Sequence, residues 1–273
     1  MRILIATKNK GKFGEIAGFL RGGVFDSVGE ATAGFAGEGS ARADFEVEFL
    51  GDYQVDDGDF TEDGVSHEEN ASKKARYYWE KFCGDDAGGD SGCVCGGASG
   101  DSGCVCGGVS GVVGVADAAG SFDFVLGEDS GIYVDALGDE LGVQTRRWGA
   151  GEKATDKEWL EYFMKEMGVR APLDSERGAK FVCCACLVRR VQGALIEEFF
   201  KGETFGKITR EIADEVLPGL PLSSVFLPEG FDKVYAELGR DEKNKISHRG
   251  QAVGKVKRWL WNYSLPGKGI SSG

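Results

Sequence analysis

Two adjacent carboxylates, Glu128 and Asp129, lie between glycines at 127–131, and the hydroxyl of Ser130 follows them. Apolar residues on both sides predict one short strand at 122–126 and a second at 132–137. Polar groups at the end of a strand are where α/β folds collect ligands. This segment therefore predicts a metal-binding or catalytic site, and an acidic turn without a ligand is the alternative.

A second candidate site lies near the N-terminus, where residues 2–6 predict a buried strand and residues 13–20 have apolar side chains at helical spacing. The segment between them is polar and basic, with Thr7, Asn9 and Lys12 among its residues. A helix N-terminus presents unpaired N–H groups and a partial positive charge, which favour an anion. A phosphate-binding loop is one interpretation. A solvated basic turn is the other, because the segment lacks the GxxxxGK[ST] pattern of a P-loop.

The elements that must position these groups follow from hydrophobic periodicity. Ser66 and Glu69 have the spacing of a capping box, which predicts the start of a helix over 66–82. Gln192 and Gly193 separate two apolar runs and predict a hairpin. The other predicted elements are strands at 45–50, 180–190, 194–200 and 223–227, an extended segment at 202–212, a helix at 154–167 and a loop-to-helix passage at 241–260.

Composition limits the class of protein. A net charge of −13 over 273 residues argues against a general nucleic-acid binder, although a nucleotide pocket depends on local lysines and arginines. We expect no membrane association, because the sequence has no apolar run of transmembrane length and no signal-peptide pattern at its start. We therefore expect a cytoplasmic protein with reduced thiols, in which Cys183, Cys184 and Cys186 act as small hydrophobic residues of a strand.

The 44 glycines are unevenly spread, and two stretches rich in glycine, at about 22–44 and 83–121, cannot bury much apolar surface. We interpret both as mobile insertions in a single α/β domain at 1–265, followed by a flexible tail at 266–273. Residues 89–97 repeat identically at 100–108. The repeat brings Cys-x-Cys pairs, which suggest either a soft-metal site or a linker. We favour the linker, because glycine makes closing a site entropically costly; the four cysteines are Cys93, Cys95, Cys104 and Cys106.

Four motifs occur in order along the chain: Thr7-x-Asn9-x-x-Lys12, Glu62-x-Gly64-x-Ser66-x-x-Glu69-Asn70-Ala71-x-x-Lys74-Ala75-Arg76, Glu128-Asp129-Ser130-Gly131-x-x-Val134-Asp135-Ala136-Leu137, and Glu242-Lys243-Asn244-x-Ile246-Ser247-His248-Arg249-Gly250-x-Ala252. With them the sequence resembles the Ham1/RdgB family of inosine triphosphate pyrophosphatases. The resemblance covers most of the chain except the insertions and the tail. It implies an ITPase-like α/β fold with an elongated mixed β-sheet and flanking helices, with two lobes around a central cleft, usually as a homodimer. It also implies hydrolysis of non-canonical purine nucleoside triphosphates (ITP, dITP and XTP) to the monophosphate and pyrophosphate.

The same resemblance implies roles for individual residues. Glu62 and Asp129 would hold Mg²⁺, and Asp129 would also activate the attacking water, with Lys74 as the second catalytic residue. The alternatives are a solvated helix lysine for Lys74 and a capping or core histidine for His248. The remaining expected roles are phosphate binding by Thr7, Asn9, Lys12 and Lys74, substrate binding by Ser130, and contacts with the base and nucleotide by Lys243, His248 and Arg249.

One family motif, Gly-Phe-Gly-aromatic-Asp-Pro, is replaced by residues 219–224. Leu220 and Leu222 stand where the aromatic residues would be, and Ser223 stands at the acidic position. Leucine has no π face, and serine offers no carboxylate to a base N–H. Three hypotheses follow: a purine-selective pyrophosphatase, the same catalyst with relaxed or altered base choice, and a catalytically weak nucleotide-binding or metal-binding protein. The intact Glu62, Asp129 and Lys74 argue against the third.

Overall fold

The computed structural model describes residues 1–21, 45–56, 58, 60–84, 112–113, 122–151, 153–214 and 216–264. The predicted insertion at 22–44, the tail at 266–273 and the repeat at 89–108 with its four cysteines lie outside these residues. Of the predicted insertion at 83–121, the described residues include 112–113, which form a short strand.

A mixed six-stranded sheet forms the centre of the molecule, in the order β2-β1-β5-β6-β7-β8. The β2, β1 and β5 strands are parallel, whereas β6, β7 and β8 each run antiparallel to the strand before them in the sheet. A separate antiparallel pair is formed by β3 and β4. The bounds are β1 Arg2–Ile5, β2 Glu46–Phe49, β3 Gln54–Val55, β4 Val112–Val113, β5 Phe124–Val134, β6 Gly178–Val191, β7 Ala194–Ile208 and β8 Phe226–Pro228.

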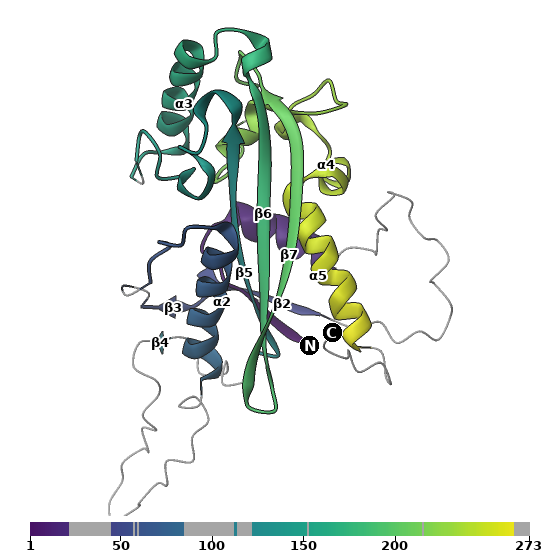
Figure 1. Ribbon diagram of the computed structural model, residues 1–273. Coiled ribbons are helices and arrows are strands. Elements are labelled where there is room, and N and C mark those ends of the chain that lie inside the picture. The colour runs from purple at the N-terminus through teal and green to yellow at the C-terminus, as the bar shows by residue number, and fades with distance from the viewer. Residues whose placement is uncertain are drawn as a thin grey trace, which may run out of the picture.

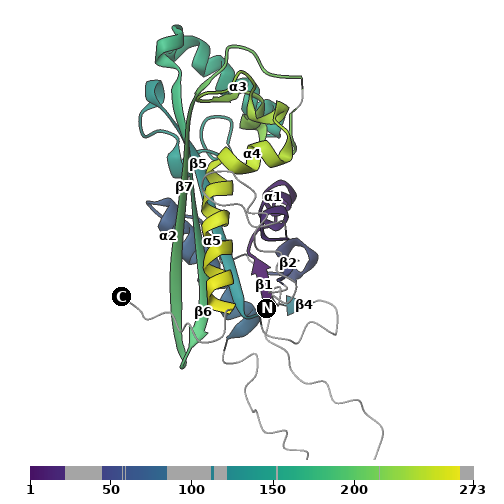
Figure 2. The ribbon, with the colours of Figure 1, turned by 90° about the vertical axis from the view of Figure 1, so that its right-hand side faces the viewer.

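Helices cover both faces of the sheet (Figures 1 and 2). On one face α1 and α5 pack over Ile3 and Ile5, while on the other face α2 packs over Leu4, as the alternation of a strand requires. A third apolar cluster surrounds α3 at the upper end, which the long β5, β6 and β7 strands reach from below. The helices are α1 Lys10–Arg21, α2 His67–Cys83, α3 Asp156–Arg170, α4 Arg240–Ile246 and α5 His248–Ser264. Among the helices described, none is long and apolar enough to span a bilayer.

The predicted break between two strands at 127–131 is wrong, because β5 continues through it and pairs with β6 along its length. The glycines there serve close packing. A Cβ added at Gly127 would lie 2.2 Å from the carbonyl oxygen of Ala71 in α2, and one at Gly131 would lie 2.1 Å from that of Gly142. Glycine therefore lets backbone approach the strand where any side chain would collide with it.

The other predicted helices and strands form with shifted boundaries, but the loop predicted at the start of 241–260 is wrong, because residues Arg240–Ile246 form α4. The predicted hairpin forms at Gln192 and Gly193, which both have positive φ, and the segment predicted separately after 202 is the end of β7. Ser66 caps α2 by accepting the Glu69 N–H at 3.1 Å, but the Glu69 carboxylate binds the Val65 N–H rather than closing the predicted box. The predicted strand at 223–227 begins only at Phe226, after a 3₁₀ turn.

Candidate active site

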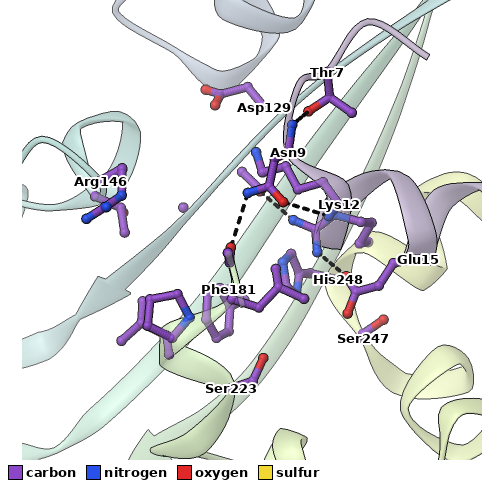
Figure 3. Close-up of a pocket in the computed structure, with 18 of the residues that line it drawn as sticks. Thr7, Asn9, Lys12, Glu15, Asp129, Arg146, Phe181, Ser223, Ser247 and His248 are labelled. Atoms are coloured by element: carbon purple, nitrogen blue, oxygen red, sulfur yellow. Dashed lines mark hydrogen bonds and ion pairs between the residues drawn. The ribbon is translucent and has the colours of Figure 1, made fainter. Parts of the chain in front are cut away.

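A cavity of about 430 Å³ brings together all ten residues predicted for the site. Its walls come from the start of α1, the middle of β5, the N-terminal half of α2, the loop at 219–223 and the start of α5 (Figure 3). The volume lies in the range of small-ligand pockets. The ten residues are Thr7, Asn9, Lys12, Glu62, Lys74, Asp129, Ser130, Lys243, His248 and Arg249.

At the N-terminus of α1, Asn9 holds three segments together. Its Oδ1 accepts the Lys12 N–H at 3.0 Å, its backbone N–H donates to Thr7 Oγ1 at 3.2 Å, and its Nδ2 donates to the Gly219 carbonyl at 3.2 Å. The first of these bonds caps α1. Asn9 therefore ties the predicted phosphate loop to the segment that replaces the base-binding motif.

Glu128 is the internal counter-ion of Lys12, which is predicted to bind phosphate, and of Arg249, which is predicted to contact the base and nucleotide. It is only 2% exposed, and its carboxylate lies 2.9 Å from Lys12 Nζ and 3.2 Å from Arg249 Nε. Burial alone would raise its pKa, but Lys12 and Arg249 hold that pKa well below the ordinary value. Lys74 donates to the Glu128 carbonyl at 3.1 Å and forms an ion pair with Glu62.

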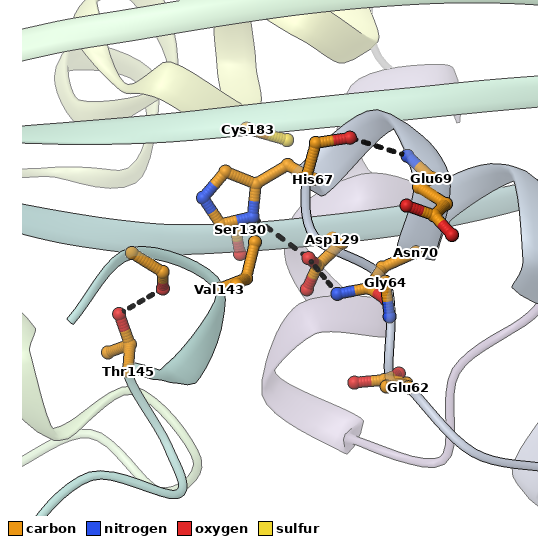
Figure 4. Close-up of polar contacts among 12 residues, drawn as sticks. Glu62, Gly64, His67, Glu69, Asn70, Asp129, Ser130, Val143, Thr145 and Cys183 are labelled. Carbon is orange, nitrogen blue, oxygen red and sulfur yellow. Dashed lines mark hydrogen bonds and ion pairs between the residues drawn. The ribbon is translucent and has the colours of Figure 1, made fainter. Parts of the chain in front are cut away.

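Asp129 projects from β5 beside the start of α2 (Figure 4). Its Oδ2 lies 2.8 Å from His67 Nδ1 and accepts from Asn70 Nδ2 at 3.1 Å, while Asn70 Oδ1 accepts the Gly64 N–H at 2.7 Å. Burial raises the pKa of Asp129, but the His67 hydrogen bond and the charge of Lys12 lower it by more. The pKa of Asp129 therefore lies below the ordinary value. Asp129 is thus a carboxylate, and Oδ1 accepts no hydrogen bond from the described residues.

Glu15 on α1 is a counter-ion of the two cations expected to contact the base, Lys243 and Arg249. It forms ion pairs with Lys243 Nζ at 2.6 Å and with Arg249, and Arg249 Nη2 also donates to Ser130 Oγ at 2.9 Å. Lys243 Nζ lies 3.5 Å from Ser223 Oγ. Both cations keep further N–H groups for a ligand, because an ammonium has three hydrogens and a guanidinium five.

His248 forms part of the apolar wall of the cavity. Its ring is buried and stacks on Phe181, with centroids 4.5 Å apart and planes 8° apart. Burial and the neighbouring Arg249 hold its pKa well below the ordinary value, so the imidazole is neutral. In this position His248 has both the packing of a core histidine and access to the cavity.

Several lining residues are not found by the motifs. Glu15 lies three residues after Lys12, so helical spacing could have indicated it. Arg147 reaches the Glu62 carbonyl from a distant loop, and no local pattern predicts that contact. In the sequence, nothing distinguishes the aromatic lining residues from residues of the hydrophobic core; they are Trp159, Phe181 and Tyr235.

The loop without the expected aromatic residues and aspartate still lines the cavity. Gly219 has φ +74° and its N–H donates to Asp156 Oδ2 at 2.7 Å, which fixes the loop against the start of α3. Leu220, Leu222 and Ser223 all line the same wall. The segment expected to bind the base therefore borders the cavity, with aliphatic and hydroxyl groups in place of the aromatic residues and the aspartate.

The residues present fit a magnesium ion. Within the described part of the chain there is no group of three or more His, Cys, Asp or Glu side chains that could hold a metal. However, Mg²⁺ keeps several waters and is bound through one or two carboxylates together with substrate phosphates. Glu62 and Asp129 supply two carboxylates to one cavity, beside the lysines expected to bind phosphate.

A family model described as the Ham1 family matches residues 112–259, more than half of the chain. A dITP/XTP pyrophosphatase of Opitutus terrae is 41% identical over 86 residues, which are 32% of this chain and 40% of that protein. One of Pyrobaculum aerophilum is 36% identical over 114 residues, 39% of this chain and 57% of that protein. These two alignments thus span less than two thirds of each relative. One of Oceanobacillus iheyensis is 27% identical over 260 residues, covering 95% of this chain and 98% of that protein.

Solved structures have the same fold. A HAM1 protein from Coxiella burnetii superposes with a TM-score of 0.62 at 24% identity, covering 96% of this chain and 98% of that one. The Ham1 protein of Staphylococcus aureus gives a TM-score of 0.59 at 21% identity, covering 97% and 100%. The expectation of a mixed α/β sheet with flanking helices is confirmed.

Proposed function

This chain belongs to the Ham1 family, and on that premise we propose that it hydrolyses non-canonical purine nucleoside triphosphates, such as ITP, dITP and XTP, to the monophosphate and pyrophosphate. The observation that carries the proposal is the cavity in which a carboxylate, Asp129, meets four of the six cationic side chains that line it. A triphosphate carries about four negative charges, and phosphoryl-type transfer depends mainly on positioning and on neutralising such charge. The four cations are Lys12, Lys74, Lys243 and Arg249.

Different side chains of the cavity would bind the phosphates and activate the attacking water. Lys12 and Lys74 lie beside the carboxylates and would bind the phosphates, together with the N–H groups at the start of α1. Asp129 lines the cavity, and its Oδ1, which accepts no hydrogen bond from the described residues, would take a proton from the water that attacks the α-phosphorus. The bond from that phosphorus to the bridging oxygen breaks, and pyrophosphate leaves with that oxygen.

Glu62 and Asp129 would hold Mg²⁺ when it is bound, and the ion would neutralise part of the charge on the triphosphate. Lys74 forms an ion pair with Glu62 and donates to the carbonyl of Glu128, the residue before Asp129. This placement keeps a cation at the phosphates before and after substrate binds.

A second candidate function, the same reaction with relaxed base choice, is favoured by the loop at 219–223. Lys243 and Arg249 can donate to the six-position oxygen of ITP or XTP, and neither can accept from the amino group of ATP. Aliphatic contact from Leu220 and Leu222 discriminates weakly between bases. We expect ITP or XTP to be preferred over ATP, by a smaller margin than in relatives with the full motif.

One assay tests both candidates: release of pyrophosphate from ITP, XTP, dITP, ATP, GTP, CTP and UTP, each with and without Mg²⁺. The purine-selective proposal requires Mg²⁺-dependent release that is fastest with ITP or XTP. Equal rates with ATP or a pyrimidine triphosphate would contradict that proposal and support the same reaction with relaxed base choice. Nucleotide binding without release from any of them would leave only a binding protein. We also expect a homodimer, which sedimentation equilibrium would detect.

A further inference from the structure

We propose that His67 is a positioning residue for Asp129: its Nδ1–H holds one carboxylate oxygen so that the other faces the cavity. The catalytic part of this inference rests on the proposed function. The four family motifs leave position 67 open, although Asn70, three residues later, belongs to one of them.

The geometry places both donors on the same oxygen. His67 and Asn70 are the first and fourth residues of α2, and both reach Asp129 Oδ2, at 2.8 and 3.1 Å (Figure 4). Rotation of the carboxylate about its Cβ–Cγ bond would move Oδ2 away from both donors, so the two hydrogen bonds together restrain that rotation. Asp129 lines the cavity, whereas His67 does not, so His67 acts through the aspartate.

The hydrogen in this contact belongs to His67. An ionised carboxylate is acceptor-only, so Nδ1 must carry the hydrogen that joins the two atoms. The other ring nitrogen, Nε2, is buried and has no hydrogen-bond partner among the described residues. The structure therefore assigns a hydrogen to Nδ1.

A packing role alone does not explain the imidazole. His67 is 6% exposed, and its ring forms a T-shaped pair with Tyr133, with centroids 6.0 Å apart and planes at 89°, a contact that a phenyl ring could also make. Burying Nε2 without a partner costs free energy that a phenyl ring would avoid. The bond from Nδ1 to Asp129 is what the imidazole adds at this position.

The direct test is the hydrogen assignment in the wild-type protein. The chain has two histidines, so a nitrogen–proton correlation spectrum of ¹⁵N-histidine-labelled protein contains two ring systems. We expect a hydrogen on Nδ1 of His67, protected from solvent exchange, and loss of that protection in Asp129→Ala, with His248 as the internal reference. A bare Nδ1 with the hydrogen on Nε2 would overturn the proposal, because His67 could not then donate to Asp129.

The kinetic test compares two replacements of the same residue. His67→Phe keeps the ring volume without the donor, and we expect kcat for ITP to fall on the order of tenfold or more, with KM changed less than about threefold. His67→Asn places an amide N–H near the position of Nδ1 and should restore kcat to within about threefold of wild type. A His67→Phe enzyme with wild-type kcat, or a folded His67→Asn enzyme as slow as His67→Phe, would refute positioning.

The two tests separate this inference from the proposed function. If no triphosphate releases pyrophosphate in the wild type, the proposed function fails, while the spectrum still shows whether Nδ1 donates to Asp129. If the wild type is active and His67→Phe is equally active, the proposed function stands and the positioning role fails.

Discussion

Asp129 combines a buried position on β5 with one carboxylate oxygen that the described residues leave free. Asp129→Asn keeps the shape of the side chain but removes the charge and the basic oxygen. We expect kcat to fall at least about a hundredfold, the lower end for general acid–base catalysis. The exposed Asp139 provides a matched control, because Asp139→Asn removes the same charge away from the cavity. Near-normal turnover of Asp129→Asn at saturating Mg²⁺ would remove Asp129 from the mechanism.

The base-binding wall gives a second prediction at the residue scale. Ser223→Asp would place a carboxylate beside Lys243, whose Nζ now lies 3.5 Å from the serine hydroxyl. Leu220→Phe would supply a π face for a purine. We expect the double variant to lower KM for ITP more than KM for ATP, because an aspartate accepts from the N1–H of hypoxanthine, which adenine lacks.

Steady-state kinetics with both substrates measure this change. Leu173→Phe is the control for the added ring, since Leu173 is 59% exposed and lies outside the cavity. An equal drop in KM for both nucleotides would show that the restored groups add affinity without selectivity.

At the scale of elements, α2 lies directly on β5 because a glycine stands beneath it. A Cβ at Gly127 would lie 2.2 Å from one backbone atom of α2 and 2.8 Å from another, and backbone cannot turn aside as a side chain can. We expect Gly127→Ala to lower the free energy of unfolding in urea by about 1–3 kcal/mol or more. Since Asp129 and Asn70 meet across the same contact, kcat should fall as well.

The control for this prediction is a glycine inside a helix with open space around it. Nothing lies within 4 Å of a Cβ built at Gly168 in α3. Gly168→Ala should raise the free energy of unfolding by about 0.5–1 kcal/mol, because alanine loses less conformational freedom in a helix. A Gly127→Ala protein as stable as wild type would mean that α2 can move away from β5.

At the scale of the whole molecule, we expect the buried ionisable groups that line the cavity to make stability depend on pH. Burial and Arg249 hold the pKa of His248 well below its ordinary 6.5, so below about pH 6.5 the unfolded chain binds a proton that the folded chain does not. The titration of Glu15 changes the free energy of unfolding in the same direction. Burial raises its pKa, but Arg249 and Lys243 lower it below the ordinary 4.5, so its stabilisation is present above about pH 4.5 and lost as pH falls through the folded value.

We therefore expect the free energy of unfolding to fall as pH is lowered below about 6.5, and to fall more steeply below about 4.5. Urea unfolding at a series of pH values measures both steps. The groups around His248 that modify its titration are Arg249, Glu128, Lys243 and Lys12. His248→Phe keeps a ring against Phe181 and should flatten the curve between about pH 6.5 and 5. An unchanged slope there would assign the first step to another group.

The sequence by itself determined what depends on neighbours along the chain. Ser66 caps α2 because its hydroxyl needs only the N–H three residues on, and Gln192-Gly193 forms a hairpin turn because the flanking runs can pair at once. The four motifs likewise named ten residues that the fold brings to one cavity. Each of those predictions rests on residue types at fixed spacing.

Only the tertiary structure decided how those residues are held. The glycines around Asp129 suggest a turn in the sequence, but α2 and Gly142 pack so closely on β5 that the strand continues and glycine is required there. The bond from His67 to Asp129 spans 62 positions and that from Glu15 to Arg249 spans 234. Periodicity and spacing report contacts within a few residues, whereas these contacts form because packing in three dimensions buries the charges of distant segments against one another.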